Sequence, residues 1–284
     1  MIQIPLNELV FDVEVAGPED GESVLLLHGF PHNRQSWTNI APVLHRAGLR
    51  TIAPDQRGYS PGARPEPTEA YALPELAGDA LGILDALGIA SAHVAGHDWG
   101  AVVGWYLAAR TPERVRSLTA SAFPHLDAYQ HALRVDPEQR DNSGYIEVLS
   151  AENAADSFLA DGAAGLEGWF RQAGEGVLSE EQIRRYVRTH TAPGTLRAAL
   201  QWYRAGTLRD DNGPLGPVTV PTTHIWSEHD PSVSVFAAEH TAGHVTGEYR
   251  FVRLQGVSHW QPQQVPETIA AEILRRAGRG RDLS

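Results

Sequence analysis

The sequence predicts an α/β protein in which a mostly parallel, doubly wound sheet carries a helical insertion. Short apolar runs alternate along the chain with longer segments of helical periodicity, and this alternation indicates a parallel sheet covered by helices. It stops at about Pro124, where interrupted polar segments of helical character begin, and resumes near residue 222. We therefore expect a core domain of residues 1–123 and 214–284 and a helical cap over residues 124–213.

Seven segments have the pattern of strands. Residues 10–16 alternate between apolar and polar side chains before a Gly-Pro turn, which is typical of a hairpin strand. Residues 23–30 form a continuous apolar run, as expected of a strand buried on both faces. The other predicted strands cover residues 49–55, 91–96, 115–123, 222–230 and 249–254.

The helices are predicted from apolar spacing and from residues typical of helix ends. From Leu73 onward apolar residues recur at spacings of three and four, with Pro74 near the start and Gly88 at the end, so this segment is a helix. Further helices are expected at residues 36–48, 99–110, 232–242 and 265–275.

Composition and charge exclude several partners and chemistries. The 284 residues carry a net charge of −12, and all 23 basic residues are arginine, which argues against nucleic acid or a membrane surface as partner. The absence of cysteine excludes disulfides, thiolate nucleophiles and Cys-ligated zinc. Residues 224–230 lack the spacing of a zinc-binding helix, so neither metal nor cofactor is expected. With no secretory signal and no apolar run of roughly 20 residues, a cytoplasmic location is expected.

A glycine-flanked turn is the first candidate for chemistry. The segment Gly96-His97-Asp98-Trp99-Gly100 lies where a predicted strand passes into a predicted helix, and glycines there leave room for a strained turn that exposes its middle residue. The helix N-terminus would also help to keep the aspartate ionised. Asp98 is thus a candidate nucleophile, and an N-cap aspartate in an ordinary turn is the alternative.

A nucleophile needs a base, and the base needs an acid that orients it. Asp230 and His259 each follow one of the last two predicted strands, and the chain order Asp98, Asp230, His259 is the nucleophile–acid–base order of α/β hydrolases. Asp127, which follows an earlier strand, is the rival orienting acid. We expect Asp230 to take this role and His259 to act as the base.

Five motifs extend this pattern along the chain: LLHGFP at 26–31, DQRGYS at 55–60, GHDWG at 96–100, the acid in WSEHD, and SHW at 258–260. Together they resemble the epoxide hydrolase branch of the α/β hydrolases, with the cap at the same place in the chain. The resemblance implies that the backbone N–H groups of Phe30 and Trp99 form an oxyanion hole. It also implies that His28 and Pro31 shape the loop at the substrate pocket.

An aspartate nucleophile indicates the class of substrate. Its attack on an acyl carbon would give an anhydride, whereas attack on an sp³ carbon gives an alkyl ester that an activated water can open. Epoxides or haloalkanes are therefore favoured over esters and amides. Epoxide opening also needs donors for the oxygen, and the resemblance implies that two cap tyrosines, Tyr145 and Tyr203, supply them. Trp202 is expected at the substrate pocket, while Trp169 and Phe170 are expected to pack the cap.

These observations predict an enzyme that opens an epoxide to a vicinal diol through a covalent Asp98 ester, with a small epoxide and water as its partners. Two alternatives stay open. A haloalkane or haloacid dehalogenase could use the same nucleophile, with the Trp99 indole as a halide donor. A hydrolase-fold protein could instead bind a ligand without turnover. Both a monomer and a homodimer are compatible with the sequence.

Overall fold

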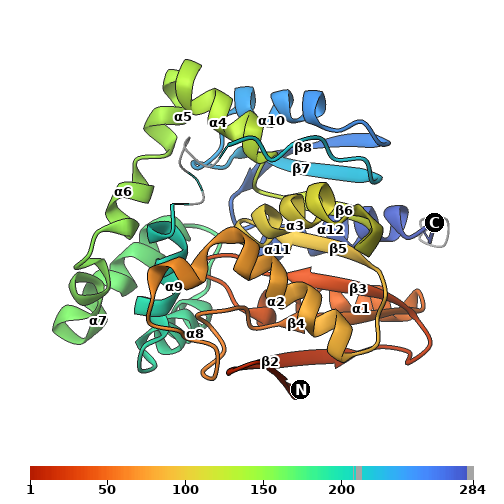
Figure 1. The fold of residues 1–284 in the computed structure, drawn as a ribbon. Coiled ribbons are helices and arrows are strands. Elements are labelled where there is room, and N and C mark those ends of the chain that lie inside the picture. Colours follow the sequence, from red (N-terminus) through yellow and green to blue (C-terminus); the bar gives the residue numbers. More distant parts are fainter. Residues whose placement is uncertain (207, 209–212, 280–284) are drawn as a thin grey trace.

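The computed structural model of the chain describes residues 1–206, 208 and 213–279. Its strands are β1 (Ile2–Leu6), β2 (Leu9–Ala16), β3 (Glu22–Leu27), β4 (Leu49–Pro54), β5 (Ala92–His97), β6 (Val115–Ser121), β7 (Thr222–His229) and β8 (Tyr249–Ser258). Across the described residues they form an 8-stranded sheet in the order β1-β2-β4-β3-β5-β6-β7-β8 (Figure 1). The β1–β2 and β2–β4 pairs are antiparallel, and every pair from β4 to β8 is parallel. The predicted mostly parallel sheet is therefore confirmed.

Helices cover both faces of this sheet. The helices of the described residues, including those of the cap, are α1 (Ala41–Arg46), α2 (Leu73–Ala86), α3 (Trp99–Arg110), α4 (Leu126–Val135), α5 (Pro137–Asn142), α6 (Tyr145–Ser150), α7 (Ala154–Ala173), α8 (Glu180–Thr191), α9 (Thr195–Arg204), α10 (Val235–His240), α11 (Gln261–Gln264) and α12 (Pro266–Arg276). Single 3₁₀ turns are η1 (Arg34–Trp37), η2 (Thr68–Tyr71), η3 (Pro112–Arg114) and η4 (Thr241–His244). Among the described helices, none combines the length and the apolar character that crossing a membrane requires.

Strand β3 shows why its last four residues are all apolar. Its side chains alternate between the two faces of the sheet: Val24 and Leu26 pack with residues of α1 and α12, while Leu25 and Leu27 pack with residues of α2 and α3. A central strand with helices on both sides has no solvated face, so it shows no polar alternation.

Most predicted elements are confirmed, and the differences lie at their ends. The strand expected to reach residue 30 ends at Leu27, because the chain then leaves the sheet to bring the Phe30 N–H to Asp98. The helix expected at 36–48 is divided into η1 and α1. The first strand, β1, was not predicted, and it pairs with the predicted hairpin strand β2.

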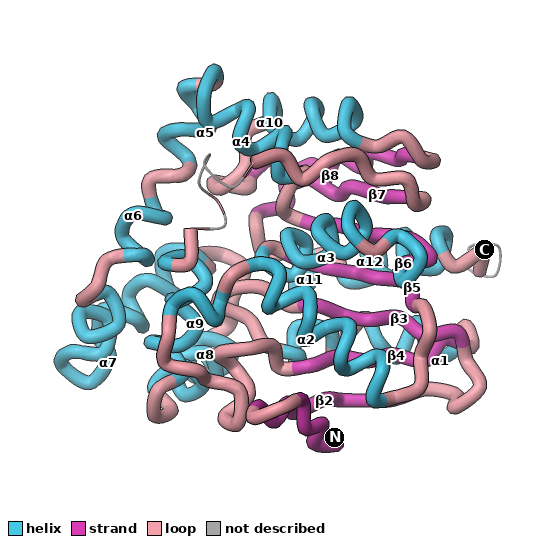
Figure 2. Tube along the Cα trace, in the orientation of Figure 1, coloured by secondary structure: helices cyan, strands magenta, loops and turns pink. Residues whose placement is uncertain are grey.

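Helices α4 to α9 form the insertion between β6 and β7 (Figure 2). The first of them, α4, packs on the core helix α10 through Ala132. The others lie beyond the carboxyl ends of the strands, and the helical backbone of α7 is broken over residues 160–163. The predicted cap limits of 124 and 213 stay a prediction, because residues 207 and 209–212 lie outside the described part of the chain.

Candidate active site

Asp98 lies on a strained turn between β5 and α3. Its φ is 55° and its ψ is −122°, a region that non-glycine residues rarely adopt. The flanking glycines permit the turn: a Cβ at Gly96 would lie 2.2 Å from the Gly100 oxygen, and a Cβ at Gly100 would lie 2.0 Å from the Leu27 oxygen. Asp98 occupies the N-cap position of α3, but its side chain makes no capping hydrogen bond. The side-chain hydrogen bond that an ordinary N-cap aspartate would make is thus absent at Asp98.

The Asp98 carboxylate accepts a backbone hydrogen bond on one oxygen and faces a histidine with the other. Its Oδ1 accepts a hydrogen bond of 2.8 Å from the Phe30 N–H, and its Oδ2 lies 3.6 Å from His259 Nε2. Burial raises the pKa of Asp98 to about 6, although the charge of His259 and the N–H groups of Trp99 and Phe30 act in the opposite direction. A Cβ at Gly29 would lie 2.1 Å from Oδ1, so only glycine lets this loop approach the carboxylate.

His259 and Asp230 follow the neighbouring parallel strands β8 and β7, whose carboxyl ends meet at the same edge of the sheet. His259 Nδ1 lies 3.0 Å from Oδ2 of the buried Asp230. Burial by itself would lower the pKa of His259, but the Asp230 carboxylate, through its charge and hydrogen bond, and then the Asp98 carboxylate raise it to about 9. The structure thus brings the three predicted residues together: His259 forms a hydrogen bond with Asp230 on one side and lies 3.6 Å from the Asp98 carboxylate on the other.

Asp127, the rival orienting acid, is engaged elsewhere. Its carboxylate accepts hydrogen bonds of 2.7 and 3.1 Å from the N–H groups of Leu215 and Gly216. Asp127, His125 and His244 bring three potential metal ligands within 4.8 Å. However, both ring nitrogens of His125 already form hydrogen bonds, to the Asp127 N–H and to the Gly216 carbonyl. The hydrogen bonds of this cluster therefore join the start of α4 to the segment that precedes β7.

A cavity of about 580 Å³ lies between Asp98 and the cap. Tyr145 of α6 and Tyr203 of α9 line it, with ring centroids 6.2 Å apart. Burial, reinforced by the charge of Asp98, raises the pKa of both tyrosines well above the ordinary value, so both hydroxyl groups keep their protons and can donate. The lining also includes His259, Phe30, Pro31, Asp141, Asn142, Leu149, Trp169, Gln172, Ala173, His229, Pro231, Ser232, Ser258 and Trp260.

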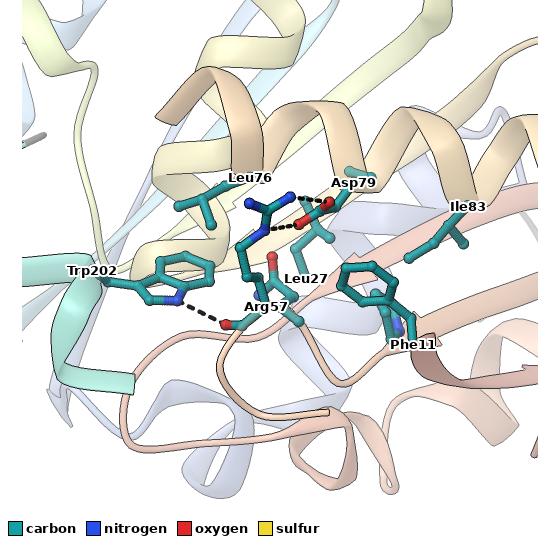
Figure 3. A pocket seen from close by; sticks show the side chains of 10 residues that line it. Phe11, Leu27, Arg57, Leu76, Asp79, Ile83 and Trp202 are labelled. Carbon is teal, nitrogen blue, oxygen red and sulfur yellow. Dashed lines mark hydrogen bonds and ion pairs between the residues drawn. The ribbon is translucent and has the colours of Figure 1, made fainter. Parts of the chain in front are cut away.

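Two predicted pocket residues are not among those that line this cavity. The His28 ring accepts a hydrogen bond from the Gln56 N–H and is buried beneath the loop. Trp202 donates its indole N–H over 2.8 Å to the Arg57 carbonyl, on the side of α9 next to α2 (Figure 3). Its neighbour Tyr203 faces the cavity instead, because successive helix residues point about 100° apart. Pro31 lies in the lining, as predicted.

Other cavity residues were not predicted as such. Trp169 was expected to pack the cap, but it lines the cavity and lies 5.7 Å from the Phe30 ring, whereas Phe170 is fully buried as expected. Trp260 lies within the SHW motif, yet it was assigned no role; it lines the cavity and donates its indole N–H to Ala173 of the cap. Local periodicity does not indicate that such an aromatic side chain will border the cavity, because its place depends on how a loop and the cap pack together.

Comparison with known proteins extends these observations. The sequence profile described as alpha/beta hydrolase fold matches residues 22–262. The chain is 34% identical over 277 residues to the AB hydrolase superfamily protein YfhM of Bacillus subtilis, with 94% of each chain covered. It is 30% identical over 316 residues to Epoxide hydrolase A of Mycobacterium tuberculosis, with 95% of each covered. The crystal structure of Bacillus megaterium epoxide hydrolase in complex with an inhibitor has a TM-score of 0.88 and 26% identity, covering 98% of this chain and 100% of that chain. The matched residues include Asp98, Asp230 and His259.

Proposed function

This chain belongs to the alpha/beta hydrolase fold family, and we propose that it is an epoxide hydrolase that converts a small epoxide and water into a vicinal diol. The observation that carries the proposal is the position of Asp98. Its carboxylate lies on the nucleophile turn, next to a His259–Asp230 pair, in a cavity that two protonated tyrosines also line. Its relatives include proteins named epoxide hydrolase, which agrees with this assignment.

In the first step Asp98 forms an ester with the substrate. The Phe30 N–H holds Oδ1, so Oδ2 is the oxygen that attacks an epoxide carbon. The Oδ2–carbon bond forms as the carbon–oxygen bond of the epoxide breaks. The oxygen, which stays on the substrate, takes up the developing charge and is stabilised by hydrogen bonds from Tyr145 and Tyr203.

In the second step water opens the ester. Esterification removes the negative charge of Asp98, which is one of the groups that raise the pKa of His259, so the imidazole becomes more readily neutral and able to accept a proton from water. The water oxygen attacks the ester carbonyl, and Oδ1 becomes an oxyanion held by the N–H groups of Phe30 and Trp99. Such a donor contributes roughly 2.7–4 kcal/mol in comparable sites. The bond between the ester carbonyl carbon and Oδ2 then breaks, and Oδ2 leaves as the second hydroxyl oxygen of the diol with the proton that His259 accepted. The water oxygen takes the place of Oδ2 in the restored Asp98 carboxylate, and the remaining proton of the water replaces the one that the epoxide oxygen takes from the cap tyrosines.

The site argues against the dehalogenase alternatives. The Trp99 side chain is not among the described residues that line the cavity, so its indole N–H is not placed to receive a departing halide. A haloacid would need a cation free to pair with its carboxylate. In the described part of the chain the cavity is lined by Asp98 and Asp141 and by no arginine, and its His259 is already paired with Asp230. A protein that only binds a ligand would not need His259 to lie between the Asp98 and Asp230 carboxylates.

The test is a turnover assay of wild type and Asp98→Ala with styrene oxide, with diol and halide followed in parallel and a 1-haloalkane as second substrate. The proposal is supported if the wild type produces diol and Asp98→Ala does not. Halide release without diol would assign the protein as a dehalogenase. If neither product forms while several aryl and alkyl epoxides are bound, the protein is a binding protein and the proposal is wrong.

A further inference from the structure

His97 connects the nucleophile turn with the loop that carries the base. It directly precedes Asp98 at the end of β5, and its side chain is fully buried. Its Nε2 lies 2.8 Å from the backbone oxygen of His259. A carbonyl oxygen only accepts hydrogen bonds, so Nε2 of His97 carries the proton and donates it.

The same carbonyl oxygen takes part in a tight turn. It also accepts a hydrogen bond of 2.9 Å from the Gln261 N–H, and Trp260 between them has φ −80° and ψ 45°, close to the geometry of an inverse γ-turn. The peptide group that follows His259 is thus held from two directions. Asp230 holds the imidazole ring, whereas His97 and the turn hold the backbone from which that ring extends.

We propose that His97 is a positioning residue, which fixes the His259 backbone so that the imidazole stays aligned between Asp230 and the Asp98 ester. The kinetic part of this inference rests on the proposed function. A water that attacks the ester must be within reach of His259 and of the ester carbon at once, and errors of about 1 Å in such geometry cost on the order of 100-fold in rate.

A neutral imidazole suits this place better than a cationic donor. The His97 ring lies 5.0 Å from the His259 ring and 5.1 Å from that of the buried His32. Burial, and then the charge of His259, hold the pKa of His97 well below the ordinary value. A donor that stays neutral can serve His259 in both of its protonation states without repelling the imidazolium.

Two variants separate the donated hydrogen bond from packing. His97→Gln keeps an N–H donor at the same number of bonds from Cα, and His97→Leu keeps an apolar side chain but loses the donor. We expect His97→Leu to slow ester hydrolysis by about 10- to 100-fold, to slow ester formation much less, and to accumulate covalent ester. His97→Gln is expected to restore hydrolysis to within about threefold of wild type, on the basis of a retained hydrogen bond.

The measurements are single-turnover rates of both steps, intact mass at steady state, and an NMR titration of His259 without substrate. The apparent pKa of His259 should fall from about 9 towards its ordinary value in His97→Leu and return in His97→Gln. The inference would be overturned if His97→Leu and His97→Gln slowed ester hydrolysis equally. It would also be overturned if His97→Leu slowed ester formation and ester hydrolysis equally while the titration of His259 stayed unchanged. If His97→Leu does not fold, His97→Asn, which is one bond too short to reach the carbonyl, must show the same loss. A wild type that forms no ester would refute the proposed function, while the titration would still decide the role of His97.

Discussion

Replacing His259 by glutamine should separate the two chemical steps. The change removes the base, so hydrolysis of the Asp98 ester should fall by the 10²- to 10⁴-fold that general base catalysis typically contributes. Ester formation does not need this base, because Asp98 attacks as a carboxylate. The variant should therefore be alkylated once and then stay trapped as the ester.

The structure also predicts how the change alters the pH dependence of ester formation. Burial raises the pKa of Asp98 to about 6 in the presence of the opposing charge of His259, 3.6 Å away. Without that charge the carboxylate is harder to ionise, so its pKa rises further. Because the carboxylate is the reactive form, ester formation should decline below about pH 6 in wild type, and this decline should move to higher pH in His259→Gln.

Intact mass spectrometry of quenched reactions checks both expectations. With styrene oxide the variant should gain the mass of one substrate molecule, at a rate that depends on pH as described. The double variant Asp98→Ala/His259→Gln is the control and should gain no mass. Diol release by His259→Gln at the wild-type rate would refute the role of the base. A folded variant that never gains mass at any pH would refute the order of the two steps.

Three further outcomes are expected. Tyr203→Phe and Tyr145→Phe should each slow ester formation by about 10- to 100-fold, the worth of one hydrogen bond to a developing charge; single-turnover rates that match wild type would remove the tyrosines from the mechanism. Gly29→Ala should abolish most activity, because its Cβ would lie 2.1 Å from the nucleophile, whereas Gly168→Ala in the cap has open space and should leave the diol rate unchanged. A styrene oxide with a para-carboxylate should be a poorer substrate than styrene oxide, because the carboxylates of Asp98 and Asp141 line the cavity and repel its charge. Asp141→Asn should narrow the difference in kcat/KM between the two substrates by about fivefold. Equal kcat/KM values of wild type for both substrates would contradict this repulsion.

The nucleophile turn could be predicted from sequence because its requirements are local. A carboxylate between two glycines, after a buried strand and before a helix, is a pattern within five residues, and the close approaches of Gly96 and Gly100 explain why both are glycine. The placing of Asp230 and His259 followed from topology. Parallel strands gather their carboxyl ends at one edge, so residues 29 positions apart in sequence (259 − 230) meet there.

The cap residues show where local pattern is insufficient. Trp202 and Tyr203 are adjacent on one helix, and so are Trp169 and Phe170. In each pair one ring faces the cavity and the other is packed elsewhere. Periodicity indicates that such a helix has a buried face, but it does not say whether that face meets the core or borders the cavity. The choice depends on the angle at which the helix crosses the strand ends.

Local sequence patterns predicted the alternation of strands and helices, the aspartate at the turn, and the acid and base after the last two strands. These features depend on short-range patterns and on the geometry of parallel sheets. Which acid meets His259 is a matter of how the folded chain packs, since the Asp127 carboxylate accepts hydrogen bonds from the N–H groups of residues 215 and 216. Only the tertiary structure placed the His97 imidazole against the His259 carbonyl, 162 residues away in sequence. Contacts of that range depend on how separate elements pack, and packing is a property of the whole fold.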